Sequence, residues 1–381
     1  MRGYIRERGE NYFELSFDLD PDANGKRKRK FHSFRGSKRE AQRKLAELIS
    51  GVSNSTYVEP TKTMVAPFVR SRIEQWEASG TISARTAQRY RQLCEKQIAP
   101  QIGNKLVQKL RPIDIEAWHN ELRKTGSARG TAVSAQTIRH AHRLLGKALS
   151  DAMRSEIVSR NVCTAQPAPK VPQSDLSIVR DIPAFLAKLR GERLEHPATV
   201  ALFTGMRLGE VFGLRWGRVD LDKKTIEVCE ALEETRAHGV TFKAPKTNAG
   251  RRTVTLPDLA FVALREQRRE LLELRLQLGA GKLGSDDLVF PALEGGPQSP
   301  SYLSKAWSDL ARRIGFPEIT FHALRHTHAS QLIDAGIDVV TISNRLGHAK
   351  PDITLRVYAH LFRQDDSKAA NAINAAFGSN S

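Results

Sequence analysis

Several short stretches in the C-terminal half of the chain carry residue types that can act on a phosphodiester. In chain order these residues are Arg207, Lys246, His322, Arg325, His348 and Tyr358. Attack by an oxygen nucleophile concentrates negative charge on the two non-bridging phosphate oxygens. Arginine suits that charge, because its planar guanidinium donates two hydrogen bonds at once and stays protonated. The set therefore predicts a site that stabilises a charged phosphoryl transition state.

Each of these residues also has an ordinary structural explanation, which its spacing alone leaves open. Arg207 stands three residues before Glu210 and could simply pair with it on a helix surface. Lys246 lies in a turn-rich stretch that also contains Lys243, so it could be a plain turn lysine. His348 could cap a helix, and the tyrosine could be a core aromatic. No single one of these motifs decides between the catalytic and the structural interpretation.

A metal site is the main alternative for the histidines. His322 and His326 are four residues apart, as in a zinc-binding helix, and His328 is close by. However, Ala323 stands where a metalloprotease of that kind carries its glutamate base. Arg325 would also lie one turn from a bound dication. The chain has no glycine-rich phosphate loop either, so we expect neither a metal nor another cofactor.

Taken together, these motifs resemble the tyrosine recombinases, and in particular the phage-type integrases. The residues that carry the resemblance are 204–210 (TGMRLGE), 245–247 (PKT), 322–326 (HALRH), 346–348 (LGH) and Tyr358. The resemblance implies that Tyr358 attacks DNA and forms a 3′-phosphotyrosyl bond, which conserves the bond energy without ATP or metal. It also implies that Arg207 and Arg325 clamp the phosphate, and that Lys246, on a hairpin, protonates the departing 5′ oxygen.

The same resemblance gives the histidines their expected roles. His322 and His348 would position the phosphate, and His322 is the better candidate for accepting the tyrosine proton. His322 and Arg325 are three residues apart in a run that is helical in pattern after Thr320, so both should face one pocket. We expect Glu210 to steady the fold rather than to take part in the reaction.

The composition agrees with a partner that is a polyanion. The 381 residues suffice for two or three domains, and the formal net charge is +18. The charge is uneven: residues 1–60 carry +4, residues 61–174 carry +11 and residues 175–381 carry +3. The three cysteines are far apart, which argues against a disulfide framework. Without a long apolar run or an apolar leader, we expect no membrane contact and no signal peptide.

The resemblance extends over nearly the whole chain and implies three domains. These are an arm-type DNA-binding domain at 1–60, a helical core-binding (SAM-like) domain at 64–165 and a catalytic domain with a C-terminal tail at 175–381. The expected fold is therefore multidomain and mainly α with small β elements. It combines an N-terminal three-stranded sheet plus helix, a helical core-binding domain and a mixed α/β catalytic domain.

The first segment predicts a small sheet packed on one helix. Residues 13–19 alternate apolar and polar side chains, and residues 26–34 form a second, very basic strand after a turn. Ser37 and Glu40 have capping-box spacing, which predicts a helix start. A basic sheet can enter the major groove of DNA, although a solvated strand or a localisation signal would look similar. Its candidate DNA ligands are Arg27, Lys28, Arg29 and Lys30.

The middle segment predicts a basic helical bundle between two linkers. Residues 50–63 are polar and turn-rich, and residues 164–174 hold three prolines. Between them, apolar spacing predicts several helices, among them 112–122 and 134–153. The strong positive charge favours phosphate-backbone binding over a merely solvated surface. The candidate ligands here are Arg85, Arg89, Arg139, Arg143 and Lys147, the last three on one helix face.

The last segment alternates helical patterns with a short β region. Residues 225–228 and 252–256 predict strands, residues 243–250 a turn and residues 259–278 a leucine-rich helix. Residues 368–377 predict a tail helix that docks on a neighbouring subunit, as in the family. Its apolar residues are Ala369, Ala370, Ile373 and Phe377.

We therefore expect a site-specific recombinase that integrates or excises a phage or other mobile element through a Holliday junction. Its expected partners are double-stranded DNA with core-type and arm-type sites, three further copies in a homotetramer, a DNA-bending host factor and an excision factor. The expected location is the bacterial host cytoplasm, at the nucleoid. Two other functions stay open: a catalytically silent architectural DNA-binding protein, and an enzyme like the type IB topoisomerases.

Overall fold

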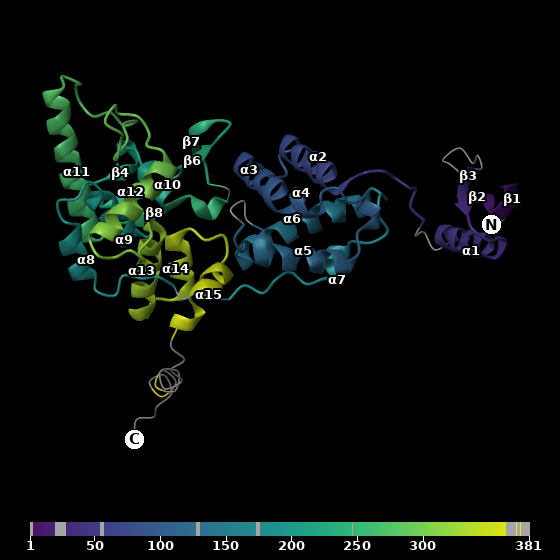
Figure 1. The fold of residues 1–381 in the computed structure, drawn as a ribbon. Helices are drawn as coiled ribbons and strands as arrows, with labels where there is room; N and C mark the ends of the chain where they lie inside the picture. The colour runs from purple at the N-terminus through teal and green to yellow at the C-terminus, as the bar shows by residue number, and fades with distance from the viewer. Residues whose placement is uncertain are drawn as a thin grey trace. The chain divides into compact units, whose positions relative to one another are not determined.

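The computed structural model describes residues 3–19, 28–53, 57–126, 130–172, 176–245 and 247–362, together with residues 371 and 374. This part of the chain is mainly helical with small antiparallel sheets, as expected (Figure 1). The chain divides into two compact units, Met1–Pro172 and Gln173–Ser381. No helix in the described ranges is long and apolar enough to span a bilayer. Arg27, Lys246 and the apolar residues of the predicted tail helix lie outside the described residues.

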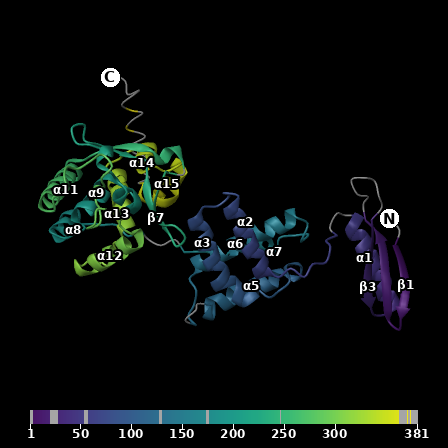
Figure 2. The same cartoon turned by 90° about the horizontal axis from the view of Figure 1, so that it is seen from above.

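The first unit begins with a three-stranded sheet on one helix (Figure 2). Its elements are β1 (Gly3–Gly9), β2 (Tyr12–Asp18), β3 (Arg29–Arg35) and α1 (Lys38–Ser53), with β2 central and antiparallel to both neighbours. The predicted alternation in β2 is confirmed, because Phe13, Leu15 and Phe17 are buried against α1. The predicted capping box is also present: the backbone N–H of Ser37 donates to Glu40 at 2.8 Å. However, α1 continues through the start of the predicted linker at residue 50.

The rest of the first unit is a helical bundle. Its helices are α2 (Val65–Ala78), α3 (Ala84–Leu93), α4 (Ala99–Ile102), α5 (Pro112–Thr125), α6 (Ala135–Arg154) and α7 (Val162–Ala165), with a π-helical turn η1 (Cys94–Ile98) and a 3-10 turn η2 (Val107–Lys109). Apolar side chains from all the longer helices form one core. Ser134 caps α6 by accepting a hydrogen bond from the Thr137 backbone N–H at 3.3 Å, as its residue type favours. The short α7 overlaps the predicted second linker.

The second unit surrounds two small sheets with helices. The strands are β4 (Val219–Asp220), β5 (Thr225–Val228) and β8 (Arg252–Thr255) in one sheet, and β6 (Ala231–Thr235) and β7 (Gly239–Lys243) in a hairpin. The helices are α8 (Ile182–Leu189), α9 (Glu195–Thr204), α10 (Leu208–Phe212), α11 (Asp258–Gln277), α12 (Pro300–Arg313), α13 (Phe321–Asp334), α14 (Val339–Leu346) and α15 (Pro351–Tyr358), with 3-10 turns η3 (Trp216–Arg218), η4 (Asn248–Gly250) and η5 (Ala359–Leu361).

Two packing features hold the second unit around the candidate site. Helix α9 is almost wholly buried between α11 and α13, so the chain that leaves its end is fixed from both sides (Figure 1). A separate small core joins α13, α14 and α15, and Tyr358 is one of its buried members. The predicted catalytic residues that the structure describes lie on α13, at the start of α10 and on or just before α15.

Candidate active site

A backbone turn after α9 presents the first arginine. Gly205 ends α9 with φ of +70°, and an added Cβ would lie 2.7 Å from His328, so glycine is required on both grounds. Arg207 follows as the N-cap of α10, and its backbone N–H donates to Glu210 at 2.9 Å. The Arg207 guanidinium donates to the same carboxylate at 2.7 Å, and the side chain stays 41% exposed. A second donor group on this arginine is thus left facing outward.

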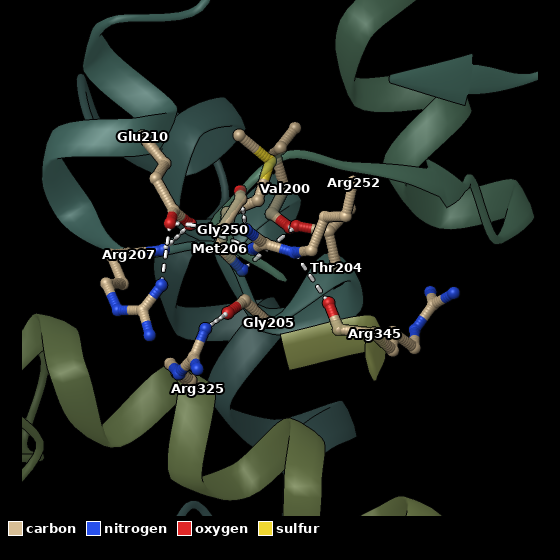
Figure 3. A network of polar contacts seen from close by, with 10 residues as sticks. All are labelled: Val200, Thr204, Gly205, Met206, Arg207, Glu210, Gly250, Arg252, Arg325 and Arg345. Carbon is tan, nitrogen blue, oxygen red and sulfur yellow. Dashed lines mark hydrogen bonds and ion pairs between the residues drawn. The ribbon is translucent and has the colours of Figure 1, made fainter. Parts of the chain in front are cut away.

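Glu210 is shared with a second arginine that the sequence analysis did not single out (Figure 3). Arg252 on β8 donates to the Glu210 carboxylate at 2.9 Å, and both side chains are under a tenth exposed. Arg252 also donates to the backbone carbonyl of Arg345 at 2.7 Å, which ties β8 to α14. Burial alone would raise the pKa of Glu210, but the hydrogen bond and charge of Arg252, with the charge of Arg207, lower it to about 2. Glu210 therefore stays ionised and holds both guanidinium groups.

Arg325 on α13 is the most constrained cation of the site. Only 2% of it is exposed, and its Nη1 donates to the backbone carbonyl of Gly205 at 2.7 Å (Figure 3). Its Nη2 is buried and makes no hydrogen bond within the described part of the chain. Burial, and then the charge of Arg207, lower the pKa of Arg325 to about 9. A buried guanidinium nitrogen without a hydrogen-bond partner, beside a second arginine, favours the binding of an anion.

The two predicted phosphate-binding histidines lie around this pair of arginines. Desolvation of the imidazole, then the charges of Arg325 and Arg207, lower the pKa of His322. Burial, with the charges of the same arginines, lowers the pKa of His348 to about 4. A 2.8 Å hydrogen bond joins His348 Nδ1 to the hydroxyl of Thr354, which orients the ring. Both imidazoles are therefore neutral near pH 7 and can still donate one hydrogen bond.

Tyr358 ends α15 with its side chain buried to 99%, and its hydroxyl bonds to a histidine that sequence reasoning did not assign to the reaction. The hydroxyl oxygen lies 2.7 Å from Nδ1 of His326, one turn along α13 from His322. Burial raises the pKa of Tyr358 to about 12, although Arg325 and Arg207 act to lower it. The charges of both arginines therefore stabilise the deprotonated form of the Tyr358 hydroxyl.

His328, the third histidine near the i, i+4 pair His322 and His326, is held inside the fold. His328 donates from Nδ1 to the Leu202 carbonyl at 3.0 Å and accepts at Nε2 from Arg345 at 3.0 Å, so both ring nitrogens are used inside the fold. No cluster of three or more metal-binding side chains occurs among the described residues. A sequence signal for His326 existed, since it stands four residues after His322, the spacing that places two side chains on one helix face.

The structure spreads the predicted DNA ligands over two parts of the first unit. On β3 and just before it, Lys28 and Arg29 are exposed, Arg29 pairs with Asp18 at 3.0 Å, and Lys30 pairs with Glu59. Arg85 and Arg89 are exposed on α3.

The remaining candidate ligands lie on α6. Burial lowers the pKa of His140, and the charges of Arg89, Arg143 and Arg139 lower it further, so these three guanidiniums act on one imidazole. The ammonium of Lys147 lies 4.0 Å from the ring centroid of Trp76, a cation–π contact that fixes its position.

Residues 180–365 match the model of the phage integrase family, and residues 69–123 match that of the phage integrase N-terminal SAM-like domain. The chain is 25% identical to a XerC-like tyrosine recombinase of Caldanaerobacter subterraneus, over 98% of each chain. It is 28% identical to an integrase of Streptomyces ambofaciens, over 91% of this chain and 88% of that one.

Solved structures share the fold. The integrase of transposon Tn1549, in complex with transposon right end DNA, aligns with a TM-score of 0.68 at 18% identity, over 83% of this chain and all of that one. A lambda integrase tetramer bound to a Holliday junction aligns with a TM-score of 0.53 at 16% identity, over 91% and 96%. The two matched domains define the class of protein, a DNA recombinase. The chain belongs to the phage integrase family of tyrosine recombinases.

Proposed function

We propose that this protein is a site-specific recombinase that integrates and excises a mobile element. In this reaction Tyr358 attacks a DNA phosphate, a 3′-phosphotyrosyl bond forms, and the free 5′ end then rejoins a partner duplex by way of a Holliday junction. The observation that carries the proposal is the buried Nη2 of Arg325, which lacks a partner in the described structure and lies beside Arg207 and within electrostatic reach of Tyr358.

The other residues follow from the chemistry of that step. Arg207 and Arg325 bind the two non-bridging oxygens, on which charge grows in the transition state. His322 and His348 donate hydrogen bonds to the same phosphate. Lys246 protonates the leaving 5′ oxygen, and no metal or nucleotide is required.

The first unit provides most of the DNA-binding surface in this proposal. Its bundle, with Arg89, Arg139 and Arg143 around His140, binds the core site. The sheet with Lys28 and Arg29 binds arm sites, and this raises the local concentration of the catalytic unit at the crossover. We propose that four copies assemble on DNA, as the lambda integrase does in its Holliday junction complex. A DNA-bending host factor and an excision factor complete the proposed machinery.

The test is a nicked suicide DNA substrate that traps the covalent intermediate. Wild-type protein should form a covalent adduct in the presence of a metal chelator, and Tyr358→Phe should form none. Arg325→Lys should lower the rate by about 10² to 10³, because lysine cannot donate to two oxygens in a fixed fork. Tyr302→Phe is the matched control, since Tyr302 is a 52% exposed tyrosine of the same unit.

Two outcomes would favour the other functions. Tight DNA binding without any adduct would indicate an architectural protein. Relaxation of supercoiled DNA of any sequence, with no recombination between two sites, would indicate a topoisomerase instead.

A further inference from the structure

The hydroxyl of Tyr358 has one hydrogen-bond partner among the described residues, and that partner is His326. The two rings come from different helices, α15 and α13, and their centroids are 5.6 Å apart at an interplanar angle of 65°. His322 touches the other side of the pair: its ring lies 4.6 Å from that of His326, edge to face, and it makes no hydrogen bond to the hydroxyl. The imidazole that contacts the nucleophile is therefore His326.

The protonation states of the pair allow the phenol to donate in this hydrogen bond. Burial raises the pKa of Tyr358 to about 12, so the phenol carries its proton near neutral pH. Burial, with the charges of His322 and Arg325, lowers the pKa of His326 to about 4, so its ring is neutral. A neutral imidazole with its proton on Nε2 can only accept at Nδ1. In that tautomer the phenol donates to His326 Nδ1, which is the orientation that proton abstraction requires and the one that our proposal assigns.

We propose that His326 is the catalytic base that takes the proton of Tyr358 during DNA cleavage. The inference rests on the proposed function. As the bond from Tyr358 Oη to phosphorus forms, the bond from phosphorus to the 5′ oxygen breaks and the phenolic proton passes to His326 Nδ1. Lys246 supplies the proton that the 5′ oxygen takes. In rejoining, the protonated His326 returns its proton to the departing tyrosine oxygen.

The charges around His326 make this base dependent on bound DNA. The groups that act on it are His322 and Arg325 from its own helix and Tyr358 from α15. Arg207 and His348 belong to the same site, because Arg207 acts on His322 and Tyr358, and His322 acts on His348. A phosphate between the two arginines offsets their repulsion of an imidazolium ion. Proton transfer therefore becomes favourable only when DNA is in place.

The experiment is single-turnover cleavage of the suicide substrate as a function of pH, with a substrate whose bridging 5′ oxygen is replaced by sulfur. A thiolate leaves without a proton, so the requirement for Lys246 disappears and the tyrosine side of the reaction is isolated. His326→Asn keeps an acceptor near the Nδ1 position but cannot take a proton. The wild-type rate should rise with pH as the base loses its proton, whereas His326→Asn should be slower by about 10² to 10⁴ and should not show this rise.

His322→Asn is the matched control on the same helix face. We expect it to slow cleavage but to keep the rise of rate with pH. His326→Ala, which opens a cavity, should recover part of its rate when imidazole is added, and His326→Asn should not. Thermal melting and DNA binding of each variant separate this effect from a loss of fold.

Three results would overturn the proposal. His326→Asn could cleave at the wild-type rate, or it could be slow with an unchanged pH profile, which would make His326 a positioning residue only. Alternatively, His322→Asn could lose the pH dependence while His326→Asn keeps it, which would assign the proton to His322. Failure of the proposed function looks different, because wild-type protein would then give no adduct at all.

Discussion

Glu210 shows how much of the candidate site depends on one carboxylate. Its oxygens accept hydrogen bonds from Arg207 and Arg252, and the Arg252 guanidinium is almost fully buried. Glu210→Ala would leave that cation buried without a counterion. We expect the free energy of unfolding to fall by about 3–5 kcal/mol, the range seen when one partner of a buried ion pair is removed.

Urea denaturation of the wild type and the variant measures this change. The matched control is Glu227→Ala, whose partner Arg218 forms a 2.6 Å ion pair with both side chains about half exposed. That exposed pair should contribute less than about 1 kcal/mol. If the free energy of unfolding falls equally in the two variants, the Glu210 carboxylate does not stabilise the buried Arg252.

At the scale of the elements, the end of α14 fixes the distance between β8 and the segment that carries His348. Gly347 ends α14 with φ of +68°, and an added Cβ would lie 2.8 Å from Arg252 Nη1 and 3.1 Å from the Ala249 carbonyl oxygen. Gly336 after α13 has φ of +77° with open space around it. Gly336→Ala should therefore cost about 1–2 kcal/mol through its backbone conformation alone. Gly347→Ala should cost more and should also slow adduct formation, because Arg252 has to move.

Unfolding free energies and single-turnover cleavage rates of the two glycine variants test this difference. If the free energy of unfolding falls equally in both variants and both keep full activity, the close approach of Gly347 to Arg252 does not affect function.

Helix α6 gives a second prediction at this scale, on DNA affinity. Replacing both Arg139 and Arg143 by Gln should weaken binding of the core site and flatten its salt dependence. The slope of log K against log salt should fall by about two, one for each phosphate contact that is lost. Replacing Arg123 and Lys124, an exposed pair on α5, removes the same charge and is the control. Equal effects from both pairs would indicate attraction by net charge only.

The elements also show where sequence reasoning succeeded and where it stopped. The alternation in β2, the capping box of α1 and the leucine-rich α11 were predictable, because each has a local periodic signal. The three-stranded sheet was expected from the resemblance, but its first strand, β1, was not located in the sequence, because nearly all of its residues are exposed and an exposed edge strand needs no apolar alternation. The β6–β7 hairpin was missed for a related reason: its residues are mostly half-exposed and mixed in polarity.

The residue types of the candidate site could be predicted from the sequence, but the contacts between its side chains could not. The order of Arg207, His322, Arg325, His348 and Tyr358 comes from the chain itself. The contact of His326 with Tyr358 does not, because it joins helices 32 residues apart in sequence. Arg252 was out of reach for the same reason: a lone arginine on a strand gives no sign that its partner lies 42 residues away.

At the scale of the whole molecule, buried histidines in both units make stability depend on pH. In the first unit a 3.2 Å hydrogen bond joins His142 and His119, and burial, then His142, lower the pKa of His119 to about 4. In the second unit burial lowers the pKa of His326 and His348 to about 4 and that of His328 to about 3. The unfolded chain takes up protons at these positions near pH 6.5, well before the folded protein does.

Stability should therefore be full above pH 6.5 and should decline as the pH falls from 6.5 to about 4. Each such histidine contributes at most about 1.4 kcal/mol for each pH unit in that window. Hydrogen exchange of the full chain at pH 7.5 and 5.0 measures both units separately, after correction for the intrinsic exchange rate. Protection that is equal at both pH values would contradict the prediction.

The unpaired nitrogen of Arg325 also bears on any attempt to engineer this protein. The positive charges of Arg207 and the buried Arg325 repel each other, and this repulsion destabilises the folded protein when no DNA is bound. An apolar residue at position 325 would relieve that repulsion and give a more stable but catalytically inactive protein. A screen for heat resistance alone would therefore enrich disabled enzymes, and selection has to score recombination and thermal tolerance together.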